Sequence, residues 1–480
     1  MAVSATPGFD LQPSAQQVPT STNYITNFDF LNQYLPDTYE KEFERYGNRT
    51  ISSFLRLVGA EMPSNSDLVK WAEQGRLHTK YTSVGSTAAA ADTAAVLQVN
   101  DTGVPAFTAS NGIAVRVGQT VMIVANNGGG SNKAIVTAVD VANNRFTVAF
   151  YENTGLAVAG TADANADYTV FIYGSEFAKG TDGMSGSLEA DDIFFENSPI
   201  ILKDKYAVSG SDMAQIGWVE VTTENGATGY LWYLKSEHET RLRFDDYLET
   251  SMIEAVPAEA AAGANPASGA LAAGFKGSEG IFYSVKERGN VWSGGNPVAL
   301  ADFDAVISRL DKQGAIEENV IFLDRDFGFD IDDMLAAQNA YGAGGTSYGL
   351  FDNDEEMALN LGFTGFRRGY DFYKSDWKYL NDPTMRGGLP SGAGSGQVNG
   401  LLVPAGSTSV YDQILGKNAK RPFLHVRYRA SETEDRRYKT WITGSAGGAR
   451  TSSLDAMEVH FLSERCVCTM GANNFFIFED

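Results

Sequence analysis

The stretch YLWYLKSEHETRLRFDDYLETSMIEAV, residues 230–256, decides the fold because it predicts one uninterrupted helix. Apolar residues recur at helical spacing and form one stripe, while Glu, Arg and Asp occupy the other face. Pro257 follows directly and ends the helix. At a rise of about 1.5 Å per residue the helix is roughly 40 Å long, enough to cross a whole domain. The stripe consists of Tyr230, Leu234, Leu242, Phe244, Leu248, Met252 and Val256.

The chain before this helix opens with a polar arm. Residues 1–25 hold a single charge and many Ser, Thr, Gln and Pro residues, a composition that does not fold alone. Three helices are then predicted: over 36–47, over 51–58, and a short one that is capped by Ser66 or Asp67 and runs through Trp71.

A strand-rich excursion separates these helices from the long helix. Over residues 82–180 charge thins out, and β-branched runs such as GQTVMIVA and KAIVTAVD alternate with turn clusters such as NNGGGSN. This pattern predicts a small antiparallel barrel or sandwich. Residues 181–224 contain two strand-like runs, SPIILKDKYAVSG and QIGWVEVTT, which are compatible with a long hairpin.

The chain after the long helix alternates helices and strands. An Ala- and Gly-rich connection leads to a predicted helix, LADFDAVISRLDKQG, which stops at Gly314. The strand NVIFLD and the helix IDDMLAAQNAYG follow, which indicates a compact α/β or α+β unit over about 276–390. The last sixty or so residues return to strands and end in the apolar run FFIF. Burial of that run implies that the C-terminus closes a sheet opened earlier, so the domains interleave.

Charge and signal content narrow the class of protein. The chain has 480 residues and a net charge of −23, from 60 acidic and 37 basic residues, so its bulk charge does not attract nucleic acid or an anionic membrane. The N-terminus has neither the basic nor the apolar region of a secretion signal, and no apolar run of about 18 residues occurs. We expect a soluble, non-secreted protein. Cys466 and Cys468 are too close for an ordinary structural disulfide, in agreement with a reducing compartment.

No motif predicts catalysis, a metal site or a cofactor. The four histidines, His78, His238, His425 and His460, lack metal-ligand spacing. The run DRDFGFDIDD holds the three letters of a kinase magnesium loop without the motifs that accompany it, so we interpret it as a solvated helix start. Cys466 and Cys468 are expected to be buried small side chains on one strand face. We therefore predict that the protein is not an enzyme.

The order of parts resembles the major capsid protein of tailed bacteriophages, with the Hong Kong 97-type fold. At residue level, GNRTISSFLRLVGAEMPSNSDLVKWAEQGRLHTKY and YKSDWKYLNDPTMRGG are similar to segments of capsid proteins of crAss-like and related marine phages. The resemblance implies an α+β fold with an inserted small antiparallel β-domain. Its parts are an N-terminal arm and helices (1–81), a β-rich insertion in the E-loop region (82–180), E-loop return strands (181–225), the spine helix of the peripheral domain (226–257), an axial domain (258–420) and the closing sheet of the peripheral domain (421–480).

The resemblance also implies a function. The chain would assemble through pentamers and hexamers into an icosahedral shell that encloses a double-stranded DNA genome without sequence-specific binding. Expected partners are further copies of the chain, a portal, a scaffold protein, and auxiliary or decoration proteins, with no membrane. The expected location is the capsid of the virion, assembled in the host bacterial cytoplasm.

A candidate contact site lies where the N-terminal helices meet the excursion. The stretch SDLVKWAEQGRLHTKY gathers an aromatic ring, charges and an imidazole at this joint. Arginine can form a bidentate pair with a carboxylate, and tryptophan can bury a large surface area. Both properties are typical of residues that anchor protein interfaces. An intrachain packing corner is an equally good interpretation. The candidate subunit-contact or joint residues are Trp71, Glu73, Gln74, Arg76 and His78.

Two other classes remain open from the sequence. A β-rich carbohydrate-binding or surface-layer structural protein agrees with the acidic balance and the Gly/Asn-rich turns, but such a protein needs a secretion signal. A glycoside hydrolase needs two positioned carboxylates, and the many acidic residues single out no pair.

Overall fold

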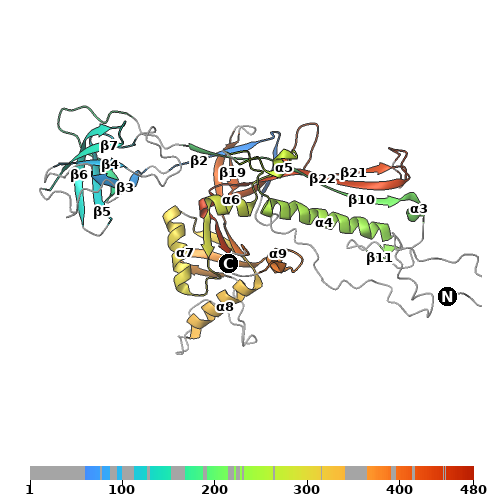
Figure 1. Ribbon diagram of the computed structural model, residues 1–480. Coiled ribbons are helices and arrows are strands. Elements are labelled where there is room, and N and C mark those ends of the chain that lie inside the picture. Colours follow the sequence, from blue (N-terminus) through green and yellow to red (C-terminus); the bar gives the residue numbers. More distant parts are fainter. Residues whose placement is uncertain are drawn as a thin grey trace, which may run out of the picture. The chain divides into compact units, whose positions relative to one another are not determined.

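The chain folds as two compact units, Met1–Asp67 with Ser198–Asp480, and Leu68–Asn197. The first unit is thus discontinuous in sequence. The computed structural model (Figure 1) describes residues 60–75, 78–86, 94–99, 113–126, 130–152, 168–186, 192–214, 221–222, 228–229, 232–262, 265–314, 316–340, 365–390, 396–412, 417–446, 448 and 450–479.

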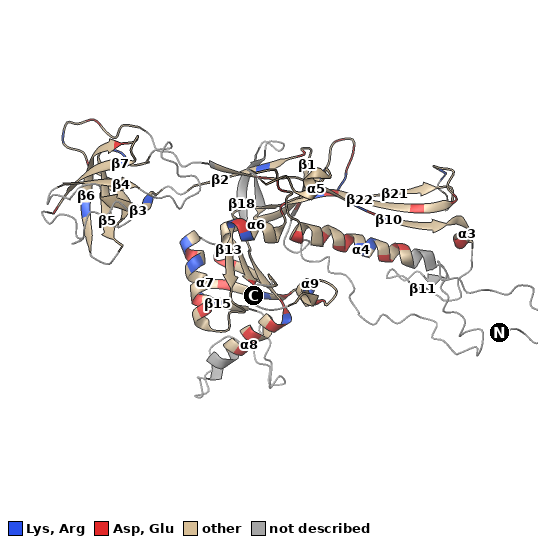
Figure 2. Ribbon diagram, viewed as in Figure 1, with Lys and Arg blue, Asp and Glu red and all other residues tan. Residues whose placement is uncertain are grey.

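The predicted long helix is confirmed as α4, Trp232–Glu254. It runs along strands β10 (Ile200–Ser209) and β22 (Ala456–Thr469) in Figure 1. Its apolar face is buried on them: the Phe244 ring lies 5.7 Å from the ring of Phe461. Figure 2 shows acidic residues along the whole described length of the helix. The predicted two-faced pattern holds only in part: Phe244 and Met252 are buried as expected, but Glu249 is buried too, with 4% of its surface exposed, and Val256 is 58% exposed.

Helix α4 packs against a five-stranded sheet in which β22 is the central strand. Strand β22 pairs antiparallel with three strands, and β1 joins the sheet in parallel beside β20. The other strands of this sheet are β1 (Ala60–Ser64), β20 (Leu424–Arg429) and β21 (Lys439–Gly444).

A six-stranded sheet in the order β13-β23-β17-β14-β16-β15 forms the second layer of the first unit. Its strands are β13 (Asn290–Ser293), β14 (Glu318–Leu323), β15 (Gly365–Arg368), β16 (Tyr370–Asp376), β17 (Val398–Pro404) and β23 (Phe476–Glu479). The associated helices are α6 (Ile281–Arg288), α7 (Leu300–Gln313) and α8 (Arg325–Ala340).

The helices and the strand predicted after residue 300 are confirmed. Helix α7 ends at Gly314, whose φ of 76° is left-handed and favours glycine. The Asp-rich run is a helix start, as predicted, because Asp324 Oδ1 accepts a hydrogen bond of 2.7 Å from the backbone N–H of Phe327. Lys374 also pairs with Asp332 in α8 at 2.7 Å.

The two sheets share one core, and the C-terminal strand is part of it. Buried side chains from α4, α6, both sheets and β23 form a single cluster, which includes Met252, Ile281, Leu401, Val467 and Ile477. The prediction that the C-terminus closes an earlier sheet is confirmed. The residues assigned to one closing sheet, 421–480, are however divided: β20 to β22 lie in the five-stranded sheet and β23 lies in the six-stranded one. Strand β23 belongs to the six-stranded sheet because its backbone pairs with β13 on one side, in parallel, and with β17 on the other, antiparallel.

The second unit contains a closed six-stranded barrel in the order β3-β4-β7-β6-β5-β8. The sequence predicts a barrel or sandwich here, and the structure has the barrel. Its interior is a separate core that includes Leu97, Val121, Phe146 and Val170. The strands are β3 (Lys80–Ser86), β4 (Ala94–Val99), β5 (Gln119–Ala125), β6 (Ser131–Asp140), β7 (Arg145–Phe150) and β8 (Tyr168–Ser175).

Two sequence predictions are wrong. The short helix through Trp71 is instead strand β2 (Val69–Gln74), because a partner strand, β9 (Asp192–Asn197), supplies its backbone hydrogen bonds. The long hairpin over 181–224 does not form in the described residues, because β10 pairs with β22. The helices predicted over 36–47 and 51–58 lie outside the described residues.

The remaining elements are short. They are α3 (Gly210–Met213), β11 (Val221–Thr222), β12 (Thr228–Gly229), α5 (Gly269–Ala272), α9 (Lys378–Asn381), β18 (Ser407–Asp412), β19 (Lys417–Pro422) and two 3₁₀ turns, Arg386–Gly388 and Ala472–Asn474.

Candidate functional site

The candidate contact residues fall on a two-stranded antiparallel ribbon, β2 with β9, in the second unit. We call this the β2–β9 ribbon. Trp71 lies directly opposite Phe195, and their ring centroids are 6.2 Å apart. Trp71 Nε1 donates a hydrogen bond of 3.1 Å to Glu73 Oε1 on the same strand face. Ile193 lies opposite Glu73 on the same face as these two rings. This face of the ribbon is therefore mainly aromatic and apolar.

The opposite face of the ribbon combines an ion pair with a large exposed ring. Lys70 and Glu196 lie across from each other and pair at 2.8 Å, with 56% and 57% of their side chains exposed. Phe194, on the same face, is 70% exposed, and Ile193 on the other face is 53% exposed. Both faces of the ribbon thus present apolar area to solvent, which a two-stranded element does not bury by itself.

The structure brings together only part of the predicted set. Trp71 and Glu73 share one face, whereas Gln74 points to the other face. His78 is exposed in the bend between β2 and β3. Arg76 lies outside the described residues.

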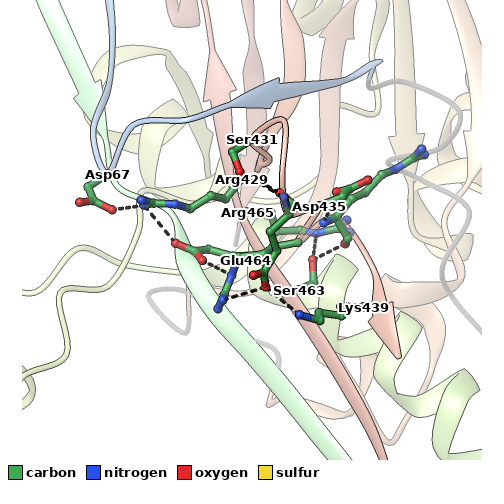
Figure 3. Close-up of polar contacts among 11 residues, drawn as sticks. Asp67, Arg429, Ser431, Asp435, Lys439, Ser463, Glu464 and Arg465 are labelled. Carbon is green, nitrogen blue, oxygen red and sulfur yellow. Dashed lines mark hydrogen bonds and ion pairs between the residues drawn. The ribbon is translucent and has the colours of Figure 1, made fainter. Parts of the chain in front are cut away.

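A second polar site was not predicted from the sequence. It lies in the five-stranded sheet where β1, β20 and β22 meet, and Figure 3 shows its contacts. We call it the Arg–Glu cluster, formed by Glu61, Arg429, Arg436, Arg437, Glu464 and Arg465.

Arg465 is the buried member of the Arg–Glu cluster, with 6% of its surface exposed. Its Nη1 lies 3.3 Å from Glu61 Oε1, and its Nε donates a hydrogen bond of 2.9 Å to Ser463 Oγ. Its Nη2 donates to the carbonyl of Arg437 at 3.0 Å. Burial lowers the pKa of the Arg465 guanidinium, but arginine remains charged at neutral pH. Glu61 therefore balances a charge that water barely reaches.

Glu464 is the buried carboxylate of the cluster. It forms ion pairs with two arginines: its Oε2 lies 2.6 Å from Arg436 Nε, and its Oε1 lies 3.5 Å from Arg429 Nη1. Successive side chains of a strand point to opposite faces of the sheet, so Glu464 and Arg465 form their ion pairs on opposite faces of β22. Arg429 also bonds Asp67, the last residue before the second unit. The cluster thus fixes the chain just before the β2–β9 ribbon begins.

The signal for this cluster was the charge-dense segment RYRASETEDRRYK, residues 427–439. Its composition alone does not separate a solvated loop from a buried network. The partner carboxylate, Glu61, is 404 positions away from Arg465. Only the parallel pairing of β1 with β20 brings the two together.

The described residues offer no metal-binding cluster, since they bring no three His, Cys, Asp or Glu side chains into a suitable group. The cysteines are free and buried on β22, which confirms the prediction for them. A hydrogen bond with Cys468 and burial raise the pKa of the Cys466 thiol. None of the helices in the described ranges combines the length and apolar character needed to cross a membrane.

No protein-family model and no curated protein matches the chain. Among solved structures, it is similar to a chain from Microbacterium phage Oxtober96, with a TM-score of 0.40, 10% identity, and 95% of this chain and 99% of that chain covered. It is also similar to a chain from Gordonia phage Cozz, with a TM-score of 0.39 and 10% identity; the match covers 97% of this chain and 98% of that chain. A third similar structure is the capsid asymmetric unit of Cyanophage Pam1, with a TM-score of 0.36 and 12% identity; the match covers 64% of this chain and 82% of that chain. All three TM-scores are below 0.5.

Proposed function

We propose that the chain is the major capsid protein of a tailed phage, a structural protein and not an enzyme. It assembles through pentamers and hexamers into an icosahedral shell around double-stranded DNA. The β2–β9 ribbon is the observation that carries this proposal. The ribbon exposes Phe194 and Ile193 on opposite faces and has the size of an element that is marginal alone. A neighbouring copy of the chain would bury both side chains.

Strand edges support the same function. In the described part of the chain, β2 and β9 form a two-stranded sheet. In the proposed shell, a strand of a neighbouring copy pairs with an edge of this sheet. Repeated head-to-tail contacts of this kind close into rings. Rings of five and six are what an icosahedral shell requires.

The arrangement of elements agrees with the Hong Kong 97-type architecture expected from the sequence. In this proposal α4 is the spine helix, and it packs with the five-stranded sheet in the peripheral domain. The six-stranded sheet with α6 to α8 is the axial domain, with β23 added to it from the C-terminus. The barrel is an insertion in the E-loop region, and the β2–β9 ribbon is the part of the E-loop next to it.

The acidic charge agrees with a container for DNA. With a net charge of −23, the chain has no overall electrostatic attraction to DNA. In this proposal the shell encloses the DNA without binding it sequence-specifically. Proposed partners are a portal, a scaffold protein, and auxiliary or decoration proteins. The proposed site of assembly is the host bacterial cytoplasm, and the proposed lineage is that of crAss-like phages.

Assembly of the purified full-length chain tests this proposal. We expect size-exclusion chromatography with light scattering to give pentamers, hexamers or larger closed particles, and negative-stain microscopy to show rings, tubes or shells. Co-expression with the proteins encoded beside it supplies a scaffold where one is needed. A strictly monomeric chain under both conditions would contradict the proposal.

A further inference from the structure

An open pocket of about 510 Å³ lies on the outer surface of the barrel. Strands β5, β6 and β8 and the residues just after β7 form it. Two tyrosines dominate it: Tyr151 is 48% exposed and Tyr173 is 45% exposed, although the barrel has its own complete apolar core. The polar groups around them are Thr120, Lys133, Glu152 and Glu176.

A carboxylate binds the Tyr151 hydroxyl, and a lysine lies near the Tyr173 ring. The Tyr151 hydroxyl donates a hydrogen bond of 2.5 Å to Glu176 Oε2, and its backbone N–H donates to the carbonyl of Lys133 at 3.1 Å. Burial and this carboxylate raise the pKa of Tyr151 to about 12, so its phenol stays protonated at neutral pH. Lys133 Nζ lies 5.9 Å from the centre of the Tyr173 ring. The Tyr151 ring is therefore oriented by its hydroxyl before any ligand arrives, which reduces the cost of binding.

The combination of rings and polar groups selects a class of ligand. An exposed tyrosine ring offers an apolar face with a polar edge, which suits the C–H face of a pyranose ring. Carboxylate oxygens accept hydrogen bonds from sugar hydroxyls, and the Lys133 ammonium donates to them. Two carboxylates, Glu152 and Glu176, outnumber this single ammonium, so a phosphate, sulfate or sialic acid is repelled. A cationic ligand would compete with Lys133 for the Tyr173 ring.

We propose that this pocket binds a neutral, hexose-containing saccharide, with Tyr151 and Tyr173 as stacking surfaces and Glu152, Glu176 and Lys133 as partners of the hydroxyl groups. The site belongs to the barrel alone. It leaves the shell function of the chain unchanged and does not depend on that function.

Saturation-transfer NMR and titration calorimetry on the full-length chain test the proposal. The ligands are maltotetraose, cellotetraose and N-acetylchitotetraose, with 3′-sialyllactose as the acidic comparison. We expect at least one neutral tetrasaccharide to bind, and Tyr151→Ala and Tyr173→Ala each to weaken its binding about tenfold, the size of effect that loss of an aromatic stacking contact produces. Tyr173→Phe keeps the ring and is expected to stay within about twofold of wild type.

Tyr247→Ala is the matched control, since Tyr247 is 47% exposed on α4 in the other unit and should not affect the affinity. Thermal unfolding of each variant checks that the barrel is folded. The proposal is overturned if none of the three neutral ligands binds at about 10 mM, where millimolar binding is readily detected. It is also overturned if the sialylated ligand binds best, or if folded Tyr151→Ala and Tyr173→Ala variants bind like wild type. Particle assembly is a separate readout, so its failure would not be mistaken for loss of the sugar site.

Discussion

Replacing Phe194 with Asp is expected to lower the yield of assembled particles by at least about tenfold, because a buried aromatic anchor at an interface contributes about 2 kcal/mol or more. The charge would have to be buried against the neighbouring copy at every equivalent contact of the shell. Folding should be nearly unaffected, since Phe194 is 70% exposed in the isolated chain and surface substitutions usually change stability by about 0.5 kcal/mol or less. Sedimentation of particles and thermal unfolding of the unassembled chain measure the two effects separately.

Phe194→Leu is the control at the same position. It removes the ring but keeps an apolar side chain, so particles should form at a yield much closer to that of wild type. Normal particle yield with Phe194→Asp would show that the ribbon face stays in solvent in the shell. A large drop in the unfolding temperature of the unassembled Asp variant would instead make Phe194 a residue of the monomer fold.

Replacing Glu61 with Gln is expected to lower the free energy of unfolding by about 2–3 kcal/mol. Removal of one partner of a buried ion pair costs roughly 3–5 kcal/mol, because the other charge stays buried without compensation. The expected loss is below that range because 26% of the Glu61 side chain is exposed, whereas only 8% of the Arg465 side chain is. Gln keeps the size of the side chain and one acceptor oxygen, so the loss reports the charge of Glu61, which pairs with Arg437 as well as with the buried Arg465. Urea denaturation of the unassembled chain measures it.

Glu196→Gln is the matched control for this charge. The substitution is identical, but the pair of Glu196 with Lys70 is more than half exposed on both sides, and exposed pairs contribute only about 0–1 kcal/mol. We expect the two variants to differ by at least about 1 kcal/mol at low salt. Equal effects would mean that Glu61 does not stabilise the buried Arg465, and that Ser463 and the backbone carbonyl of Arg437 suffice for it.

Elements whose stability is local could be predicted from the sequence. Helices α4 and α7 follow from apolar periodicity over many residues, together with Pro257 and the left-handed Gly314 as their ends. The barrel strands follow from β-branched runs between turn clusters. In each case the signal lies within about ten to thirty residues, so distant parts of the chain do not change it.

Elements that depend on distant partners could not be predicted. The segment from Ser66 or Asp67 through Trp71 is predicted to be a short capped helix, yet Val69–Gln74 forms strand β2 because β9, more than 100 residues later, pairs with it. The Arg–Glu cluster depends in the same way on the parallel pairing of β1 with β20. Of the candidate contact residues, which stay a prediction, the structure places Trp71 and Glu73 on one face of the ribbon. The sequence did not show that Phe194 and Ile193, from the partner strand, are the most exposed apolar side chains of the ribbon.

An electron cryomicroscopy reconstruction of the assembled wild-type particle tests the central claim most directly. We predict rings of five and six copies in which the Phe194 face of the β2–β9 ribbon is covered by a neighbouring copy of the chain. Closed particles in which both faces of the ribbon remain exposed to solvent in every copy would contradict the assigned contact. A chain that forms no closed assembly at all, with its scaffold present, would contradict the shell function itself.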